Sequence, residues 1–116
     1  DRSGTGRRPV GEVVVPATVR EDPVVASLAT GGASPALSKH LRQRLEEELA
    51  GAGAMAELTA EVRTDLRARD VGPDARREAV RRVVRSPSVW KGLGDGSTNA
   101  RREATAVIAE VVGDEQ

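Results

Sequence analysis

The chain has 116 residues, enough for one domain or a piece of a larger protein, and 18 basic and 18 acidic side chains give it a formal net charge of +0. This balance argues against a general polyanion-binding protein, and the absence of cysteine excludes disulfides and thiolate metal sites. No apolar run approaches the ~18 residues of a membrane-spanning helix. With no Phe, no Tyr and one Trp, the core must be built from Leu, Val and Ala, so a partner surface is expected to add stability.

The first regular structure is expected to be a β-hairpin. Residues 1–9 are polar and glycine-rich, as in a loop, whereas residues 12–28 hold two apolar runs around the turn-forming residues 20–23. Because two strands alone form a weak sheet, they are expected to pair with further strands, from another domain or from a second copy of the chain. We therefore predict that residues 1–33 form a loop and a dimerisation hairpin.

The segment TGGASP (30–35) joins the second strand to the first helix. Gly31 and Gly32 allow a positive φ or the close approach of a ligand to the backbone. Ser34 suits the N-cap, and Pro35 suits the first helical position. Such a helix start gathers free N–H groups and attracts anions, but a plain strand-to-helix turn explains the same residues.

Residues 34–116 predict an all-helical domain of about five helices, so the fold class is α+β. Ser34–Pro35, Pro73 and Ser86–Pro87 mark helix starts, while the glycines at 51–53 and 92–97 mark ends. The periodic apolar residues expected to face inward are Leu37, Leu41, Leu45, Leu49, Met55, Leu58, Val62, Leu66, Ala79, Val80, Val83, Val84, Ala100, Ala104, Val107, Ile108 and Val111.

Other candidate sites are weaker. The segment GLGDGS (92–97) has Ser where a dinucleotide fingerprint needs its third glycine, and it follows a helix, so a loop is expected. His40 is the only histidine and, without cysteine, does not suggest a zinc site. Arginines between residues 76 and 85 spread round their helix, which indicates a solvated face rather than a nucleic-acid surface.

Residues 13–49 resemble the precorrin-2 dehydrogenase and sirohydrochlorin ferrochelatase family, whose members complete siroheme. The family pattern is strand, proline, strand, then a Ser/Thr-Gly-Gly-x-Ser-Pro-x-Leu junction and a helix rich in Arg, Leu and Glu. The junction is matched by Thr30, Gly31, Gly32, Ser34, Pro35 and Leu37. The segment 86–108 resembles the family's closing helices. Family members begin with an NAD-binding Rossmann domain, and the chain is expected to start where that domain ends.

The resemblance implies a cytoplasmic enzyme that oxidises precorrin-2 to sirohydrochlorin with NAD and inserts Fe²⁺ as a substrate. This part would be inactive without the NAD-binding domain. It implies that the substrate's carboxylates are bound by Thr30, Gly31, Gly32, Ser34, Lys39 and Arg42. Asp1 matches the family's catalytic aspartate and would act as general base.

The expected partners are a tetrapyrrole and a second copy of the chain, with no nucleic acid, no membrane and no protein-bound metal. Two alternatives remain open. One is a fragment that binds a tetrapyrrole or dimerises without catalysis. The other is a small regulator that binds nucleic acid through the arginine-rich third helix.

Overall fold

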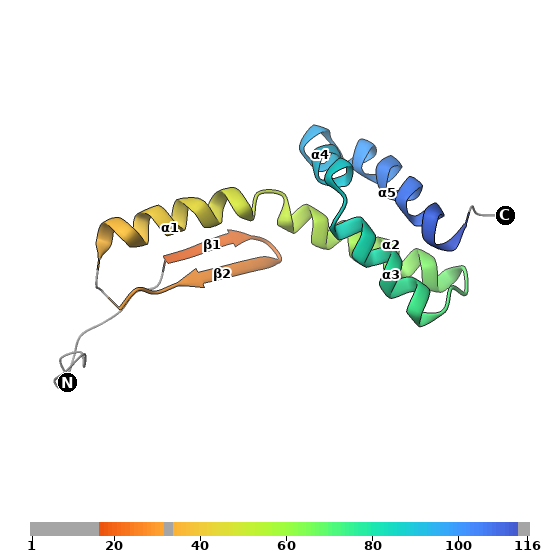
Figure 1. The fold of residues 1–116 in the computed structure, drawn as a ribbon, viewed down its shortest axis with the longest axis horizontal. Coiled ribbons are helices and arrows are strands. Elements are labelled where there is room, and N and C mark those ends of the chain that lie inside the picture. Colours follow the sequence, from red (N-terminus) through yellow and green to blue (C-terminus); the bar gives the residue numbers. More distant parts are fainter. Residues whose placement is uncertain (1–16, 32–33, 114–116) are drawn as a thin grey trace. The chain divides into compact units, whose positions relative to one another are not determined.

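The structure is a computed structural model that describes residues 17–31 and 34–113. A two-stranded antiparallel hairpin precedes five helices in this part of the chain (Figure 1). The elements are β1 (Ala17–Glu21), β2 (Val24–Leu28), α1 (Pro35–Glu48), α2 (Ala52–Ala68), α3 (Pro73–Val84), α4 (Pro87–Asp95) and α5 (Ser97–Val112). The α+β fold class predicted from the sequence is confirmed.

The described residues form two compact units. Residues 17–20, 25–31 and 34–48 make up the first, and residues 21–24 and 49–113 make up the second. We call these the hairpin unit and the helical unit. The expected division of the chain into 1–33 and 34–116 stays a prediction.

The hairpin unit buries little apolar surface. Val19 is its only buried apolar residue among those described, and α1 contains no buried residue. The apolar stripe of α1 is half-buried at Leu41 and Leu45, whereas Leu37 is 46% exposed. A hydrogen bond of 3.3 Å joins the hydroxyls of Thr18 and Ser27 across the two strands. The unit is therefore stabilised by contacts between half-buried side chains rather than by a fully enclosed apolar core.

The helical unit has a continuous core to which α2, α3, α4 and α5 all contribute. Its buried apolar residues are Met55, Leu58, Val62, Leu66, Ala79, Val83, Val89, Ala100 and Ala104. Gly92 permits close packing of α4 on α5, because a Cβ there would lie 2.8 Å from the Cα of Ala100. The scarcity of large aromatic side chains is thus offset by close helix contacts at small residues.

The helix starts lie where the sequence predicted them. The Ser34 hydroxyl accepts a hydrogen bond from the Leu37 N–H at 3.1 Å, and the Ser86 hydroxyl accepts one from the Val89 N–H at 3.3 Å. Pro73 is the first residue of α3, and Gly72 is the N-cap of this helix. These starts depend on local capping, which acts within one turn of the chain.

Three local expectations were wrong. Leu37, expected to face inward, is 46% exposed, because α1 contains no buried residue. Val84 is 41% exposed, because it is the last residue of α3 and the core side of that helix is filled by Ala79 and Val83. The segment 92–97 is helical as far as Asp95, since Gly92 is buried against α5 and only Gly96 leaves the helical conformation. Gly92 therefore allows the two helices to pack closely and does not mark a loop.

Candidate functional site

We call residues 30–34 the glycine junction. It lies between the end of β2 at Leu28 and the start of α1 at Pro35. Gly31 is exposed and has a φ of 71°, a left-handed conformation that glycine adopts without steric cost. The chain therefore reverses at a position that leaves the backbone open to solvent. Gly32, which the sequence assigned to the same site, lies outside the described residues, as does Asp1.

The hydroxyl groups of the junction are engaged with the first turn of α1. The Oγ1 of Thr30 lies 2.7 Å from the Oγ of Ser38, in a half-buried position. Ser34 accepts from the Leu37 N–H through its hydroxyl and from the Ser38 N–H through its carbonyl, at 3.1 and 3.0 Å. Since Pro35 has no N–H, fewer free donors remain here than a bare helix start would offer. Capping therefore leaves fewer backbone N–H groups that could bind an anion.

Positive charge at the junction comes from two exposed side chains of α1. Lys39 and Arg42 are three residues apart, so they project from neighbouring positions on the helix surface. The Nε of Arg42 lies 3.6 Å from the Oε2 of Glu46, an exposed ion pair that adds little stability. Both cations can therefore turn to an incoming carboxylate. His40, between them in sequence, is exposed.

A second candidate lies in the helical unit, in a groove of about 640 Å³ between α2 and α3. Five of its seven lining residues are arginines, and we call it the arginine groove. It is lined by Arg63, Arg67, Pro73, Arg76, Arg77, Val80 and Arg81. This set brings together residues from two helices that are separated by the turn at 69–72.

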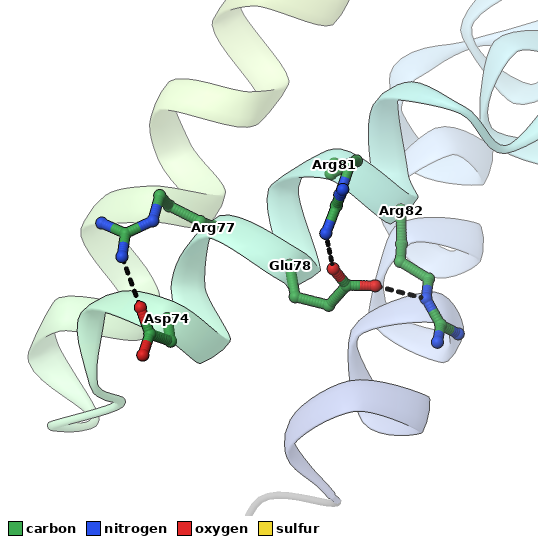
Figure 2. A network of polar contacts seen from close by, with 5 residues as sticks. All are labelled: Asp74, Arg77, Glu78, Arg81 and Arg82. Atoms are coloured by element: carbon green, nitrogen blue, oxygen red, sulfur yellow. Dashed lines mark hydrogen bonds and ion pairs between the residues drawn. The ribbon is translucent and has the colours of Figure 1, made fainter.

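Acidic residues of α3 hold part of this positive charge in place (Figure 2). Asp74 accepts a hydrogen bond from Arg77, while Glu78 accepts from Arg81 and, at 3.1 Å, from Arg82. The hydrogen bond from Arg81, followed by that from Arg82, lowers the pKa of Glu78 below its ordinary value of 4.5. These pairs orient the arginines but leave them at the surface.

The sequence interpretation missed this groove. It noted that the α3 arginines spread round their helix, but it did not combine three of them with Arg63 and Arg67 of α2. The available signal was the spacing of four between Arg63 and Arg67, followed by a short turn and Pro73. That pattern allows two antiparallel helices to share one basic face.

The described residues do not fit a dinucleotide such as NAD. They contain one two-stranded antiparallel sheet, and the strand-to-helix loop reads TGGASP rather than GxGxxG. Among the same residues, no group of three or more His, Cys, Asp or Glu side chains is placed to hold a metal ion. None of the described helices has the length and apolar character required to span a membrane.

Comparison with known proteins identifies relatives over most of the chain. It is 30% identical to the precorrin-2 dehydrogenase of Methanosarcina barkeri over 101 residues, which are 86% of this chain and 45% of that protein. It is 33% identical to the siroheme synthase of Acinetobacter baylyi over 98 residues, 84% of this chain and 21% of that protein. With the siroheme synthase of Methylococcus capsulatus it shares 33% identity over 92 residues, 78% of this chain and 19% of that protein.

The chain thus spans less than half the length of each of these relatives. No family model and no solved structure matches it. The resemblance carried by residues 13–49 is confirmed: the chain is similar, over most of its own length, to part of precorrin-2 dehydrogenase and siroheme synthase.

Proposed function

We propose that this chain is the dimerisation and tetrapyrrole-binding part of a cytoplasmic enzyme of siroheme biosynthesis. The enzyme oxidises precorrin-2 to sirohydrochlorin with NAD and inserts Fe²⁺, its metal substrate, to give siroheme. The observation that carries this proposal is the similarity to a precorrin-2 dehydrogenase over 86% of the chain. Siroheme synthases matched over 84% and 78% of the chain support the same pathway.

The role of the described residues in this reaction is to bind and orient the substrate. Lys39 and Arg42 supply positive charge beside the open backbone at Gly31, and tetrapyrrole substrates of this kind carry several carboxylates. NAD, which accepts the hydride in the complete enzyme, has no fitting site among residues 17–31 and 34–113. Its binding is assigned to a domain outside them.

Asp1 is the proposed general base. A carboxylate suits this task because oxidation and metal insertion both require protons to leave the substrate, while the macrocycle nitrogens hold the metal. Because it takes protons from the tetrapyrrole after the substrate has bound, replacing Asp1 should change the reaction rate rather than the substrate affinity.

A homodimer is proposed from the hairpin unit. Val25 of β2 is 48% exposed, Leu37 of α1 is 46% exposed, and the described part of the hairpin leaves two strand edges. A second copy would cover such surfaces and complete the sheet. Sedimentation at micromolar concentration should therefore show a dimer, and a monomer would remove this part of the proposal.

The test of the catalytic proposal uses the full protein that contains this chain. We expect Asp1→Asn to lower kcat for both precorrin-2 oxidation and iron insertion by about 100- to 10,000-fold, with little change in substrate affinity. Asp1→Glu, which keeps the carboxylate, should retain part of the rate. Near wild-type rates in the Asn variant would show that Asp1 is not the base.

A second candidate is a tetrapyrrole-binding protein without catalysis. It is favoured by the lack of any fit to a dinucleotide among the described residues. If the full protein binds a tetrapyrrole tightly but does not reduce NAD in the presence of precorrin-2, this second function replaces the first.

A further inference from the structure

The arginine groove collects more positive charge than the stability of the fold explains. Arg63 and Arg67 are four residues apart on α2, a spacing at which like charges repel and weaken a helix slightly. Neither forms an ion pair with any residue in the described ranges 17–31 and 34–113. Two arginines with no ion-pair partner among the described residues, beside three more, are a local electrostatic cost that an anionic ligand would remove.

The three arginines of α3 are oriented before any ligand arrives. The Nη1 of Arg76 donates to the Val71 carbonyl at 2.8 Å, in a half-buried position. Arg77 and Arg81 are held by Asp74 and Glu78, as Figure 2 shows. Their side chains remain 73% and 58% exposed, so these ion pairs add little stability and can be exchanged for ligand contacts. Orientation in advance lowers the entropy cost of binding.

The rest of the groove suits an organic ligand rather than an inorganic ion. Pro73 and Val80 contribute apolar lining between the arginines. The volume of about 640 Å³ falls within the range of small-molecule sites. A ligand with carboxylates on short alkyl arms would place its methylene groups on Pro73 and Val80 while its carboxylates meet the guanidinium groups. Arginine is well matched to this task because it binds carboxylates through two parallel hydrogen bonds.

A nucleic acid fits the groove less well. A nucleic-acid footprint needs basic residues that continue along a surface, but Asp74 and Glu78 lie on α3 itself and Glu61 and Asp65 lie on α2. The chain has no Phe or Tyr and one Trp, so it offers few aromatic rings for stacking on bases. The formal net charge of +0 also gives no general attraction to polyanions.

We propose that the arginine groove is a carboxylate-binding site for the acetate and propionate arms of a tetrapyrrole. This ligand assignment rests on the proposed function in siroheme biosynthesis, while the groove itself is a property of the helical unit. Arg63 and Arg67 contribute charge that no residue in the described part of the chain pairs, and Arg76 contributes a guanidinium fixed by the backbone. The site is distinct in sequence from the glycine junction of residues 30–34.

The test is a titration of the full protein with uroporphyrin I, a stable porphyrin that carries acetate and propionate arms, followed by calorimetry and by ligand absorbance. We expect the double variant Arg63→Gln/Arg67→Gln to bind at least about tenfold more weakly, since each charge-assisted hydrogen bond is worth about that factor. Arg102→Gln is the matched control, because Arg102 is an exposed arginine of α5 that does not line the groove. It should bind within about twofold of the wild type.

A variant with the opposite sign guards against a merely structural effect. Glu78→Gln removes a negative charge that competes with the ligand for the Arg81 guanidinium, and this gain should exceed the loss of orientation, so uroporphyrin should bind more tightly than to the wild type. A damaged fold would not produce tighter binding. A porphyrin with two carboxylates should bind more weakly than uroporphyrin and should be less sensitive to the Arg63→Gln/Arg67→Gln change.

The outcomes separate this site from the proposed function. If wild-type protein binds uroporphyrin and oxidises precorrin-2, but the double variant binds as the wild type does, the groove proposal is wrong and the function stands. If uroporphyrin binding depends on the groove but precorrin-2 is not oxidised, the site stands and the catalytic proposal fails. Binding of a short DNA duplex in place of uroporphyrin, lost in the same double variant, would overturn the carboxylate assignment.

Discussion

The two units of the chain differ in how their apolar residues are covered. The helical unit encloses a core in which Leu66 is 1% exposed and Val83 and Val89 are fully buried. In the hairpin unit only Val19 is buried among the described apolar residues, and α1 contributes none. Packing within the chain therefore accounts for the helical unit, whereas the hairpin unit presents surfaces suited to a partner or a ligand. The following changes test this difference.

The largest effect should come from the core of the helical unit. Leu66→Ala removes a fully buried side chain and should reduce the free energy of unfolding by about 2–5 kcal/mol, measured by denaturant titration with circular dichroism. The matched change Leu37→Ala, at an exposed leucine of α1, should cost only about 0.5 kcal/mol. A comparable loss at Leu37 would show that this face is covered in solution, as in a dimer.

The next effect concerns ligand affinity at the glycine junction. Thr30→Glu places a carboxylate beside the first turn of α1, where repulsion of a substrate carboxylate at ~4 Å is worth about 1–4 kcal/mol. We expect sirohydrochlorin affinity to fall more than the melting temperature. Thr30→Val, which removes the hydrogen bond to Ser38 without adding charge, is the control and should mainly affect stability. If Thr30→Glu lowers the melting temperature and leaves affinity unchanged, the junction is only a turn.

A smaller effect is expected at the contact between α4 and α5. Gly92→Ala would place a Cβ 2.8 Å from the backbone N and Cα of Ala100, so the helices must separate, at a cost of about 1–3 kcal/mol in unfolding free energy. Gly94→Ala lies in the same helix with nothing within 4 Å, and should be neutral or stabilising by up to about 1 kcal/mol. Equal effects at the two positions would contradict the close packing described here.

The smallest effect should be seen at Glu78. Its pKa is lowered in the folded protein by hydrogen bonds from Arg81 and Arg82, so its ionised form favours folding above its ordinary pKa of 4.5. This contribution is lost as the pH falls through the lowered pKa. The Glu78→Gln variant should therefore have a slightly lower melting temperature than the wild type at neutral pH. In strong acid the two melting temperatures should be the same. Arg81→Gln should show the same trend, and a difference that grows on acidification would contradict the assignment.

Helix starts and the hairpin could be predicted from sequence because their causes are local. A Ser-Pro pair caps and opens a helix within one turn, as at Ser34 and Ser86, and turn residues between two β-branched runs form a hairpin. The inward face of α5 followed from its periodicity, and Ala100 and Ala104 are indeed buried. Val84 was misassigned because periodicity does not say where a helix leaves the core.

The candidate sites were predicted less completely, because they depend on contacts between elements. Thr30, Ser34 and α1 are close in sequence, so their proximity could be expected, but the hydrogen bond between Thr30 and Ser38 could not. The arginine groove joins Arg63 and Arg67 to Arg76, Arg77 and Arg81 across a turn, and such a face exists only once α2 and α3 pack side by side. Charge counted along one helix cannot reveal a site shared by two.

The single tryptophan gives the helical unit its own optical signal. Trp90 is half-buried in α4 against the core, and its indole N–H donates to the Val84 carbonyl at 2.7 Å. Because the chain has no Tyr or Phe, its intrinsic ultraviolet emission comes from this one ring. The emission therefore reports on α3 and α4, while the hairpin unit is silent. Comparing tryptophan emission with circular dichroism, which reports on the whole backbone, would separate the unfolding of the two units without any added label.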